Sequence, residues 1–375
     1  MSDVNSRVAA VARIGIGIAL LMELATTAPV LLALTRPDIL RAPYLGSAEP
    51  VASWLAAAIL GTWALAAVAF TMGAYTILAA VAITTALVVT LGLDQQLYSN
   101  HLYLMMLFVG LLTVARADRA HSVDSWRRGE RVTSPQWPML LIRGQVSLVY
   151  LFAALAKLNA DFLSGTVLNS YLRTEGPLAL PSSWRSFELM AGLSLLTIAM
   201  ELLLAAGLLL PRWRRSTMTL GLGLHAGMIL WMTVPYQLLV FAITMFSGYL
   251  AFLAPGRGSM TVVWDDSCGF CAGWVRWFGR LDWLGALRFV PLSALPQVGL
   301  RVTPDEAATA MHAVTGSSKR AGFRAVTRVL GVLPVSFLWA PLLDLPPIRG
   351  IGERAYGAVA RRRTCNVIPG TSSAS

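Results

Sequence analysis

Charged residues are scarce in this chain. Only 13% of its 375 residues are Asp, Glu, Lys or Arg, whereas 56% are hydrophobic. So apolar a chain cannot keep its whole surface in water, and a bilayer must solvate much of it. The composition therefore excludes a wholly soluble protein and indicates an integral membrane protein.

Cysteine is also rare, since the chain has only Cys268, Cys271 and Cys365. A structural zinc site needs four Cys, His or carboxylate ligands. Cys268 and Cys271 lack two further ligands of this kind, because Cys365 lies near the tail and His312 is the only nearby histidine. We therefore expect no metal and favour a redox pair, with two structural thiols as the plain alternative.

Eight apolar runs are candidates for membrane spans, each of which needs about 20 mostly apolar residues. They lie near residues 11–34, 51–70, 74–93, 101–115, 139–158, 188–210, 216–233 and 237–254. The first run lacks the cleavage site of a removed signal peptide, so we expect it to remain as a span. Residues 1–256 are thus predicted to form a multi-span α-helical membrane domain.

Arginines predict the orientation of these spans. Two loops are basic, the one after the fourth span and the one after the sixth: Arg116, Arg119, Arg127, Arg128 and Arg131, then Arg212, Arg214 and Arg215. Basic loops remain in the cytoplasm, and both share one side if eight spans begin inside. Residues after 256 would then be cytoplasmic at the plasma (inner) membrane, where a Cys-x-x-Cys more often reduces its substrates.

Residues 257–375 differ in kind, with shorter apolar runs that alternate with charge. The pattern predicts a strand, a helix and a second strand, then a helix, a third strand, a Gly-rich turn and further helices: 260–264, 269–281, 286–291, 304–310, 311–315 and from 322 onward. Strands that alternate with helices behind a Cys-x-x-Cys are typical of a small α/β thioredoxin-like domain.

The two close cysteines begin the helix predicted over 269–281. Cys268 would lie at the helix N-terminus, where free N–H groups and the positive end of the helix dipole favour the thiolate. We therefore expect Cys268 to attack a substrate and Cys271, one helical turn further on, to resolve the mixed disulfide.

The second domain resembles the DCC-type thiol-disulfide oxidoreductases. The matching motifs run in order through the domain: Asp265-x-x-Cys268-x-x-Cys271, Arg280-Leu281-Asp282, Phe289-Val290-Pro291-Leu292, 322–326, Leu345-Pro346-Pro347 and 356–363. The resemblance implies protein-disulfide reductase activity toward a protein or small thiol or disulfide, with no cofactor required. Asp265 is either a proton acceptor beside the resolving thiol or an ordinary strand-end or helix-capping aspartate. Asp266 departs from the family, which usually has glycine there.

Five polar side chains fall at membrane depth: Glu23, His101, Lys157, Glu201 and His225. Such residues mark either functional sites or hydrogen bonds between helices, and a lysine can also snorkel to the interface. Steps of three and four residues place Lys157 on one helical stripe with five other residues: Arg143, Ser147, Tyr150, Ala154 and Asp161. Together these residues predict an internal polar pocket.

The segment 141–165 resembles the horizontally transferred transmembrane (HTTM) domain, and Asn100-His101-x-Tyr103-Leu104 fits its preceding signature. The resemblance covers roughly residues 7–255. This domain is shared with vitamin K-dependent gamma-carboxylases, in which a lysine matching Lys157 is the base toward the reduced quinone and the matching histidine belongs to the same site. Lys157, His101, Glu23 and His225 are therefore candidates for a quinone site.

Two functions of different class follow. The first is a membrane-anchored thiol-disulfide oxidoreductase whose membrane pocket exchanges electrons with a quinone or docks a substrate. The second is an HTTM-type accessory or maturation factor, or a carboxylase-like enzyme, in which Lys157 acts and the cysteines are secondary. The second domain has 14 basic and 7 acidic residues, which fits an anionic lipid surface better than nucleic acid. The sequence names neither the substrate nor the oligomeric state.

Overall fold

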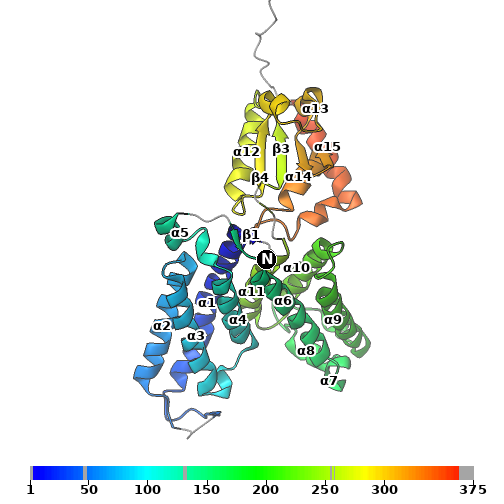
Figure 1. Cartoon of the computed structure of the whole chain (residues 1–375). Helices are drawn as coiled ribbons and strands as arrows, with labels where there is room; N and C mark the ends of the chain where they lie inside the picture. The colour runs from blue at the N-terminus through cyan, green and yellow to red at the C-terminus, as the bar shows by residue number, and fades with distance from the viewer. Residues whose placement is uncertain (1–2, 45–48, 130–132, 254–255, 257, 363–375) are drawn as a thin grey trace, which may run out of the picture. The chain divides into compact units, whose positions relative to one another are not determined.

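The computed structural model describes residues 3–44, 49–129, 133–253, 256 and 258–362 (Figure 1). The chain separates into two compact units, Met1–Ala254 and Pro255–Ser375.

The first unit is a bundle of apolar helices. Six are long and apolar enough to cross a membrane: α1 (Ser6–Ala33), α2 (Ser53–Met72), α3 (Thr76–Leu93), α6 (Trp137–Ala156), α9 (Phe187–Gly207) and α11 (Pro235–Leu253). The shorter α4 (Asn100–Val114) and the more polar α10 (Arg214–Trp231) occupy the two remaining predicted positions. The predicted multi-span α-helical fold class is confirmed.

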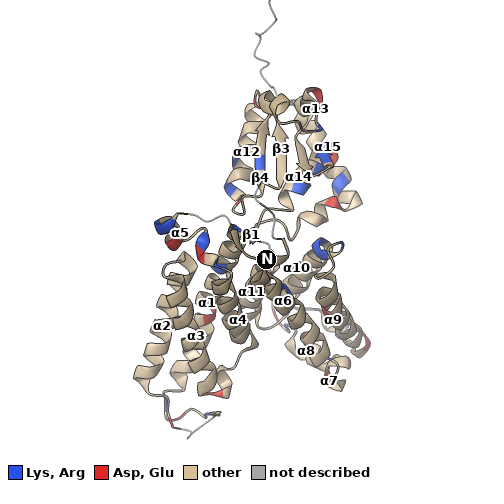
Figure 2. Cartoon of the chain, viewed as in Figure 1, with Lys and Arg blue, Asp and Glu red and all other residues tan. Residues whose placement is uncertain are grey.

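Arginines tie several helix ends together at one end of this bundle. Arg143 in α6 donates to the carbonyl of Ala251 near the end of α11, at 2.8 Å. Arg214 at the start of α10 donates to the carbonyl of Phe252, at 3.4 Å. The starts of α6 and α10 and the end of α11 therefore lie together, and Figure 2 shows basic residues gathered there.

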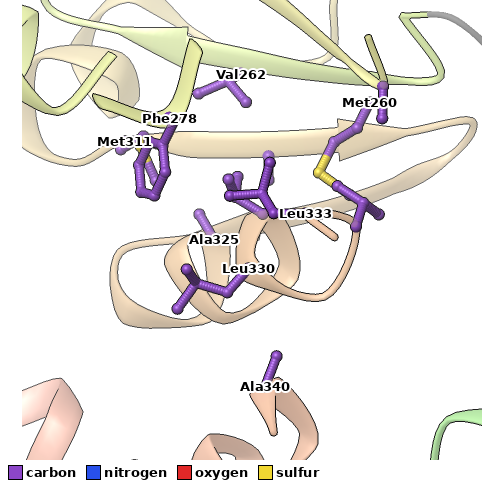
Figure 3. Packing of buried hydrophobic residues seen from close by; sticks show 12 residues of the cluster. Met260, Val262, Phe278, Met311, Ala325, Leu330, Leu333 and Ala340 are labelled. Carbon is purple, nitrogen blue, oxygen red and sulfur yellow. The ribbon is translucent and has the colours of Figure 1, made fainter. Parts of the chain in front are cut away.

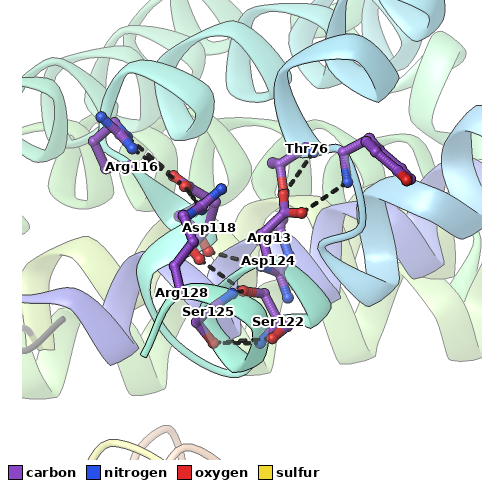
Figure 4. A network of polar contacts seen from close by, with 10 residues as sticks. Arg13, Thr76, Arg116, Asp118, Ser122, Asp124, Ser125 and Arg128 are labelled. Atoms are coloured by element: carbon purple, nitrogen blue, oxygen red, sulfur yellow. Dashed lines mark hydrogen bonds and ion pairs between the residues drawn. The ribbon is translucent and has the colours of Figure 1, made fainter. Parts of the chain in front are cut away.

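The chain's beginning lies at the same end. β1 (Asp3–Asn5) pairs antiparallel with β2 (Thr133–Pro135), which leads into α6. Arg13 of α1, labelled in Figure 4, is completely buried. Its guanidinium donates to the carbonyl oxygens of Ala117 at 2.7 Å and His121 at 2.6 Å. The start of α1, the arginine-rich loop after α4 and the end of α11 thus share one side, as an even number of crossings requires.

Asp124, in the short helix α5 (Val123–Arg128), completes this polar cluster (Figure 4). Its carboxylate accepts hydrogen bonds from the backbone N–H of Tyr75 at 3.0 Å and of Thr76 at 2.9 Å. Because these N–H groups have no partner within the helix, the carboxylate satisfies the start of α3. The loop after α4 is therefore attached both to α1 and to the turn between α2 and α3.

The second unit is built on a four-stranded sheet in the order β4-β3-β5-β6. The strands are β3 (Met260–Trp264), β4 (Leu287–Pro291), β5 (His312–Thr315) and β6 (Ser318–Ala321). β3 and β4 are parallel and are joined by α12 (Gly269–Leu281), whereas β5 is antiparallel to β3 and β6 to β5. The predicted small α/β domain is confirmed.

β6 is a correction to the predicted order of elements, which had only a Gly-rich turn there. Its residues Ser318–Ala321 are polar and mostly exposed, so they lack the apolar alternation that marks a half-buried strand. It forms because the turn returns the chain along β5 and places it at the edge of the sheet.

Neighbouring residues of β3 face opposite sides of the sheet, as the two-residue period of a strand requires. Val262 belongs to a buried cluster with Phe278 of α12 and with Ala325 of α14 (Phe323–Leu330), shown in Figure 3. Val263 belongs to a second cluster with Ala307 of α13 (Pro304–Thr309). β3 is therefore held on both faces, which gives the segment that follows it a rigid base.

Candidate functional site

The two cysteines lie where the sequence placed them, at the junction of β3 and α12. After Trp264 the chain makes a turn in which the Cys268 N–H donates to the carbonyl of Asp265, at 3.3 Å. Cys268 is the N-cap residue of α12, and its own carbonyl accepts from Ala272, at 3.0 Å. Cys271 is the third residue of the helix. The positive end of the α12 dipole therefore lies beside both sulfurs.

The accessibility of the two thiols differs from what their predicted roles require. Cys268, the predicted attacking residue, is only 1% exposed, whereas Cys271 is partly exposed. The helix terminus favours Cys268 as the thiolate, but solvent reaches Cys271 more easily.

Asp265 is used within the turn. Its carboxylate accepts from the backbone N–H of Ser267 at 3.0 Å and from the Ser267 hydroxyl at 2.6 Å. This is the bonding of an aspartate that shapes a turn through its own side chain. Asp265 is therefore an ordinary strand-end aspartate that shapes the turn, and it does not cap α12, whose N-cap residue is Cys268. A catalytic role for Asp265 stays a prediction.

Asp266 joins the cysteine loop to the segment after β4. Its two carboxylate oxygens accept from the Ser293 N–H at 3.2 Å and from the Ser293 hydroxyl at 2.6 Å. Partial burial acts to raise the pKa of Asp266, but the hydrogen bonds from Ser293 outweigh it and lower the pKa below its ordinary value. Asp266 is therefore ionised at neutral pH, and its bonds hold the loop in place.

An apolar cavity of about 260 Å³ opens beside Cys271. Aromatic rings form much of its wall: Trp264, Phe270, Trp274, Phe278, Phe323 and Tyr356. The rest of the lining comes from α12, from Met311, from α14 and from α15 (Pro346–Arg362), and none of the lining side chains is charged. Cys268 does not contribute to this wall.

In the first unit, the Lys157 ammonium lies 2.9 Å from a carboxylate oxygen of Glu201. Lys157 caps the C-terminus of α6, and Glu201 lies on α9. The Glu201 side chain is 8% exposed and that of Lys157 is 27% exposed. Two of the five predicted membrane residues are thus brought together as an ion pair between neighbouring helices.

A second polar group links three helices. The Tyr150 hydroxyl of α6 lies 3.0 Å from Nε2 of His225 on α10 and 2.6 Å from the hydroxyl of Tyr249 on α11. His225 also contacts the ring of Phe241, with centroids 5.4 Å apart, and His101 stacks on the same ring at 4.7 Å. The two predicted histidines therefore meet through one phenylalanine.

Comparison with known proteins agrees with this division. A family model for the HTTM domain matches residues 2–255. The chain belongs to the HTTM domain family. A second model, for the DCC1-like thiol-disulfide oxidoreductases, matches residues 262–365, so the fusion predicted from the motifs is confirmed. No solved structure matches the chain.

Within the HTTM domain, Glu23 stands apart from the other predicted residues. It lies on α1 and is 4% exposed, and its Oε2 atom has no hydrogen-bond partner among the described residues. No contact in the described part of the chain joins it to Lys157 or His225. Its membership of one common pocket stays a prediction.

The predicted stripe on α6 is correct for Ser147, Tyr150 and Ala154, which are buried. It is wrong for Asp161, which is exposed, because α6 ends at Ala156 and Asp161 belongs to the separate short helix α7 (Ala160–Leu163). Helical spacing holds only as far as the helix continues.

Sequence reasoning missed two buried polar residues of the HTTM domain, Arg13 and Tyr249. Arg13 was detectable as a charged residue inside the first apolar run. Tyr249 carried no such signal, since a tyrosine in a span is most often an apolar or interfacial residue. Among all the residues that the structure describes, no group of three His, Cys, Asp or Glu side chains is placed to hold a metal ion.

Proposed function

We propose that this HTTM-family protein is a membrane-anchored thiol-disulfide oxidoreductase of the protein-disulfide reductase type, with Cys268 and Cys271 as its redox pair. The observation that carries the proposal is the position of Cys268 at the N-cap of α12, directly after the doubly packed strand β3, with Cys271 opening onto an apolar cavity. A thiolate at a helix N-terminus beside a substrate-sized hollow is the arrangement that thiol-disulfide exchange needs.

The test is a single turnover with the purified full-length chain in detergent. The chain is reduced, freed of reductant and mixed with a fluorescent peptide disulfide, and the released thiol is measured. The wild-type chain and a Cys365→Ser variant are expected to reduce one disulfide per chain, whereas Cys268→Ser/Cys271→Ser is expected to reduce none. Reduction by the double variant would contradict the proposal.

The location of the redox domain belongs to the same proposal. The arginine-rich loop after α4 lies on the same side of the HTTM domain as the end of α11, from which the redox domain continues. Because basic loops remain in the cytoplasm, this supports a plasma (inner) membrane protein with a cytoplasmic redox domain. In that compartment a reduced pair would act as a reductant.

We extend the proposal to a quinone in the HTTM domain, held near His225 and Lys157. The buried atoms that lack a hydrogen-bond partner among the described residues include Ser147 Oγ, Glu201 Oε2 and His225 Nδ1. Buried polar atoms of this kind call for a polar partner. Ser147 and His225 can donate to a quinone carbonyl, and Glu201 can accept from the reduced form. A bound quinone would supply two-electron chemistry.

Binding of a short-chain naphthoquinone tests this extension without relying on activity. Equilibrium dialysis against the detergent-solubilised chain is expected to show saturable binding that weakens about tenfold in Ser147→Ala/His225→Ala, since two hydrogen bonds are lost. Thr113→Ala is the control, because the Thr113 hydroxyl bonds to the carbonyl of Val109 in its own helix. Equal binding by all chains would contradict the site.

The alternative is a carboxylase-like or accessory role in which Lys157 is a base. Here Lys157 is bound to Glu201 at 2.9 Å, so it would have to leave this ion pair before accepting a proton from a substrate. That favours the redox proposal. In cells whose phenotype depends on the protein, the redox role predicts that Cys268→Ser abolishes that phenotype. The alternative predicts that Lys157→Ala abolishes it and that Cys268→Ser leaves it unchanged.

A further inference from the structure

Cys271 is the more accessible member of the predicted redox pair. It is partly exposed and lines the apolar cavity, whereas Cys268 is 1% exposed and lies outside the cavity wall. A substrate disulfide has to approach one sulfur closely before exchange can begin. The structure therefore presents Cys271 to the substrate first, in the reverse of the order expected from the helix terminus.

The cavity beside Cys271 has the size and chemistry for one apolar side chain. Its volume is about 260 Å³ and none of its lining residues is charged. This is slightly below the range of about 300–1,000 Å³ usual for drug-sized ligands, so the cavity has room for one ring. A substrate with only polar groups beside its sulfur would leave the aromatic wall exposed to water. A substrate with an aromatic or large aliphatic side chain there would cover this wall.

A basic hollow of about 550 Å³ adjoins this cavity, and the two share Phe323, Tyr356 and Ala360 in their walls. Its charged lining residues are three basic and one acidic: Lys319, Arg320, Arg324 and Glu353. Lys319 is paired with Glu306 at 2.8 Å and Arg324 with Glu353 at 3.1 Å. Arg320 adds a further exposed positive charge. The hollow is therefore suited to an acidic group next to the apolar one.

We propose that Cys271 is the sulfur that meets the substrate, and that the substrate is a peptide disulfide with a large apolar residue beside its cysteine and an acidic residue next to that. The apolar side chain fills the cavity, and the acidic one lies in the hollow near Arg320. This inference rests on the proposed function and specifies its substrate class.

The exchange balances within the pair. The Cys271 thiolate attacks the substrate disulfide, so a bond forms between Cys271 and one substrate sulfur while the substrate disulfide breaks and its other sulfur leaves as a thiolate that takes up a proton. The Cys268 thiolate then attacks the Cys271 sulfur, which releases the second substrate thiol and leaves a Cys268–Cys271 disulfide. The substrate gains two electrons and the pair loses two.

Single-cysteine chains test which sulfur acts first. In a Cys365→Ser background, Cys268→Ser leaves only Cys271 and Cys271→Ser leaves only Cys268. Each full-length chain is mixed with a peptide whose cysteine is joined to mercaptoethanol through a disulfide, and adduct formation is followed by mass spectrometry. We expect the chain that keeps Cys271 to form its adduct about tenfold faster, because its sulfur is the more exposed.

The peptide sequence tests the cavity. The chain that keeps Cys271 is expected to react about tenfold faster with a peptide carrying Phe beside its cysteine than with Ser there, since burial of an aromatic side chain contributes on this scale. Ala355→Trp, on the rim of the cavity, should remove this preference. Arg354→Trp, which is exposed and lines neither hollow, should retain it.

The charge at Arg320 gives an independent measurement. Glu in place of Lys after the apolar residue of the peptide should speed the reaction about two- to fivefold at low salt, and Arg320→Glu should remove this advantage. Arg301→Glu, an exposed arginine outside both hollows, is the matched control.

The outcomes separate this inference from the proposed function. A faster reaction at Cys268, or an equal rate with Phe and Ser peptides, overturns the inference while the redox function stands. Failure of both single-cysteine chains to react with any peptide overturns the redox function itself.

Discussion

The Tyr150 hydroxyl lies 2.6 Å from the Tyr249 hydroxyl and 3.0 Å from the His225 ring, so one phenol connects α6, α10 and α11. Both tyrosines are almost completely buried. Close packing supports the contact, since a Cβ on Gly221 of α10 would lie 2.1 Å from the Tyr249 hydroxyl. The group therefore acts as a polar junction inside an otherwise apolar bundle.

Removal of these hydroxyls should lower the free energy of unfolding, and the loss should be larger for Tyr150 than for Tyr249. Tyr249→Phe deletes one hydrogen bond and is expected to cost about 0.6 kcal/mol, the typical value for such bonds between membrane helices. Tyr150→Phe deletes two and should cost about twice as much. Thermal unfolding of the full chain in detergent measures both, and an equal or smaller loss in Tyr150→Phe would speak against the junction.

Gly73 should not tolerate a side chain. Its φ of +66° and its contact with Arg13 both oppose one, because a Cβ would lie 2.4 Å from Arg13 Nη1 and 2.3 Å from Ser122 Cβ. Gly73→Ala is expected to destabilise the HTTM domain by about 1–3 kcal/mol in thermal unfolding. Gly61→Ala in α2 is the control, since nothing lies within 4 Å of its Cβ position, and it should be neutral or slightly stabilising. Similar behaviour of the two variants would contradict the prediction.

The Lys157–Glu201 pair should show strong coupling. Lys157→Met leaves the nearly buried Glu201 carboxylate without its partner, so it is expected to destabilise the chain. Adding Glu201→Gln removes the uncompensated charge and should recover part of the loss. A double-mutant cycle by thermal unfolding should give a coupling energy of about 1–3 kcal/mol. Strictly additive effects would show that the pair contributes little.

The ion pair of Glu306 should make the redox domain sensitive to acid. Hydrogen bonds from Lys319, and then from the Thr303 backbone, lower the pKa of Glu306 from 4.5 to about 2. A lowered pKa stabilises the fold above the ordinary value, and this contribution is lost as pH falls from about 4.5 toward about 2. The difference in unfolding temperature between wild type and Glu306→Gln should be constant near neutral pH and shrink with acid. A difference that stays constant down to pH of about 2 would refute this.

The proposed orientation predicts how thiols label in intact cells. A membrane-impermeant maleimide should reach the partly exposed Cys271 only after the cells are permeabilised. Thr166→Cys, in the exposed part of α8 (Thr166–Tyr171), should label without permeabilisation, because the end of α6 lies opposite the end of the bundle that holds the arginine-rich loop after α4. Immediate labelling of Cys271 would place the redox domain outside and favour an oxidase or isomerase.

Much of the fold could be predicted because its signals are local. Long apolar runs located eight helices, and the switch to shorter alternating runs after residue 256 marked the second domain. The strand at 260–264 and the helix at 269–281 agree with the structure to the residue. β6 was missed because an edge strand with polar side chains has no apolar period.

The candidate site was predicted in its residues but not in its geometry. The spacing of Cys268 and Cys271 and the polar residues inside apolar runs are properties of short segments, and they singled out these cysteines, Lys157 and the two histidines as candidates. Glu201 was also among the predicted membrane residues. Its ion pair with Lys157 was not predicted, because the two residues lie on different helices.

Class, domain order and candidate chemistry follow from the chain of residues alone, because hydropathy, periodicity and motif spacing act over a few neighbours. The fold was needed to show which sulfur lines the apolar cavity, since the wall beside Cys271 is completed by Met311 and by residues of α14 and α15, far along the chain. It was also needed to show that Arg13 is held by carbonyls of a loop more than a hundred residues away. Contacts of this kind depend on how helices and strands pack, which no local pattern records.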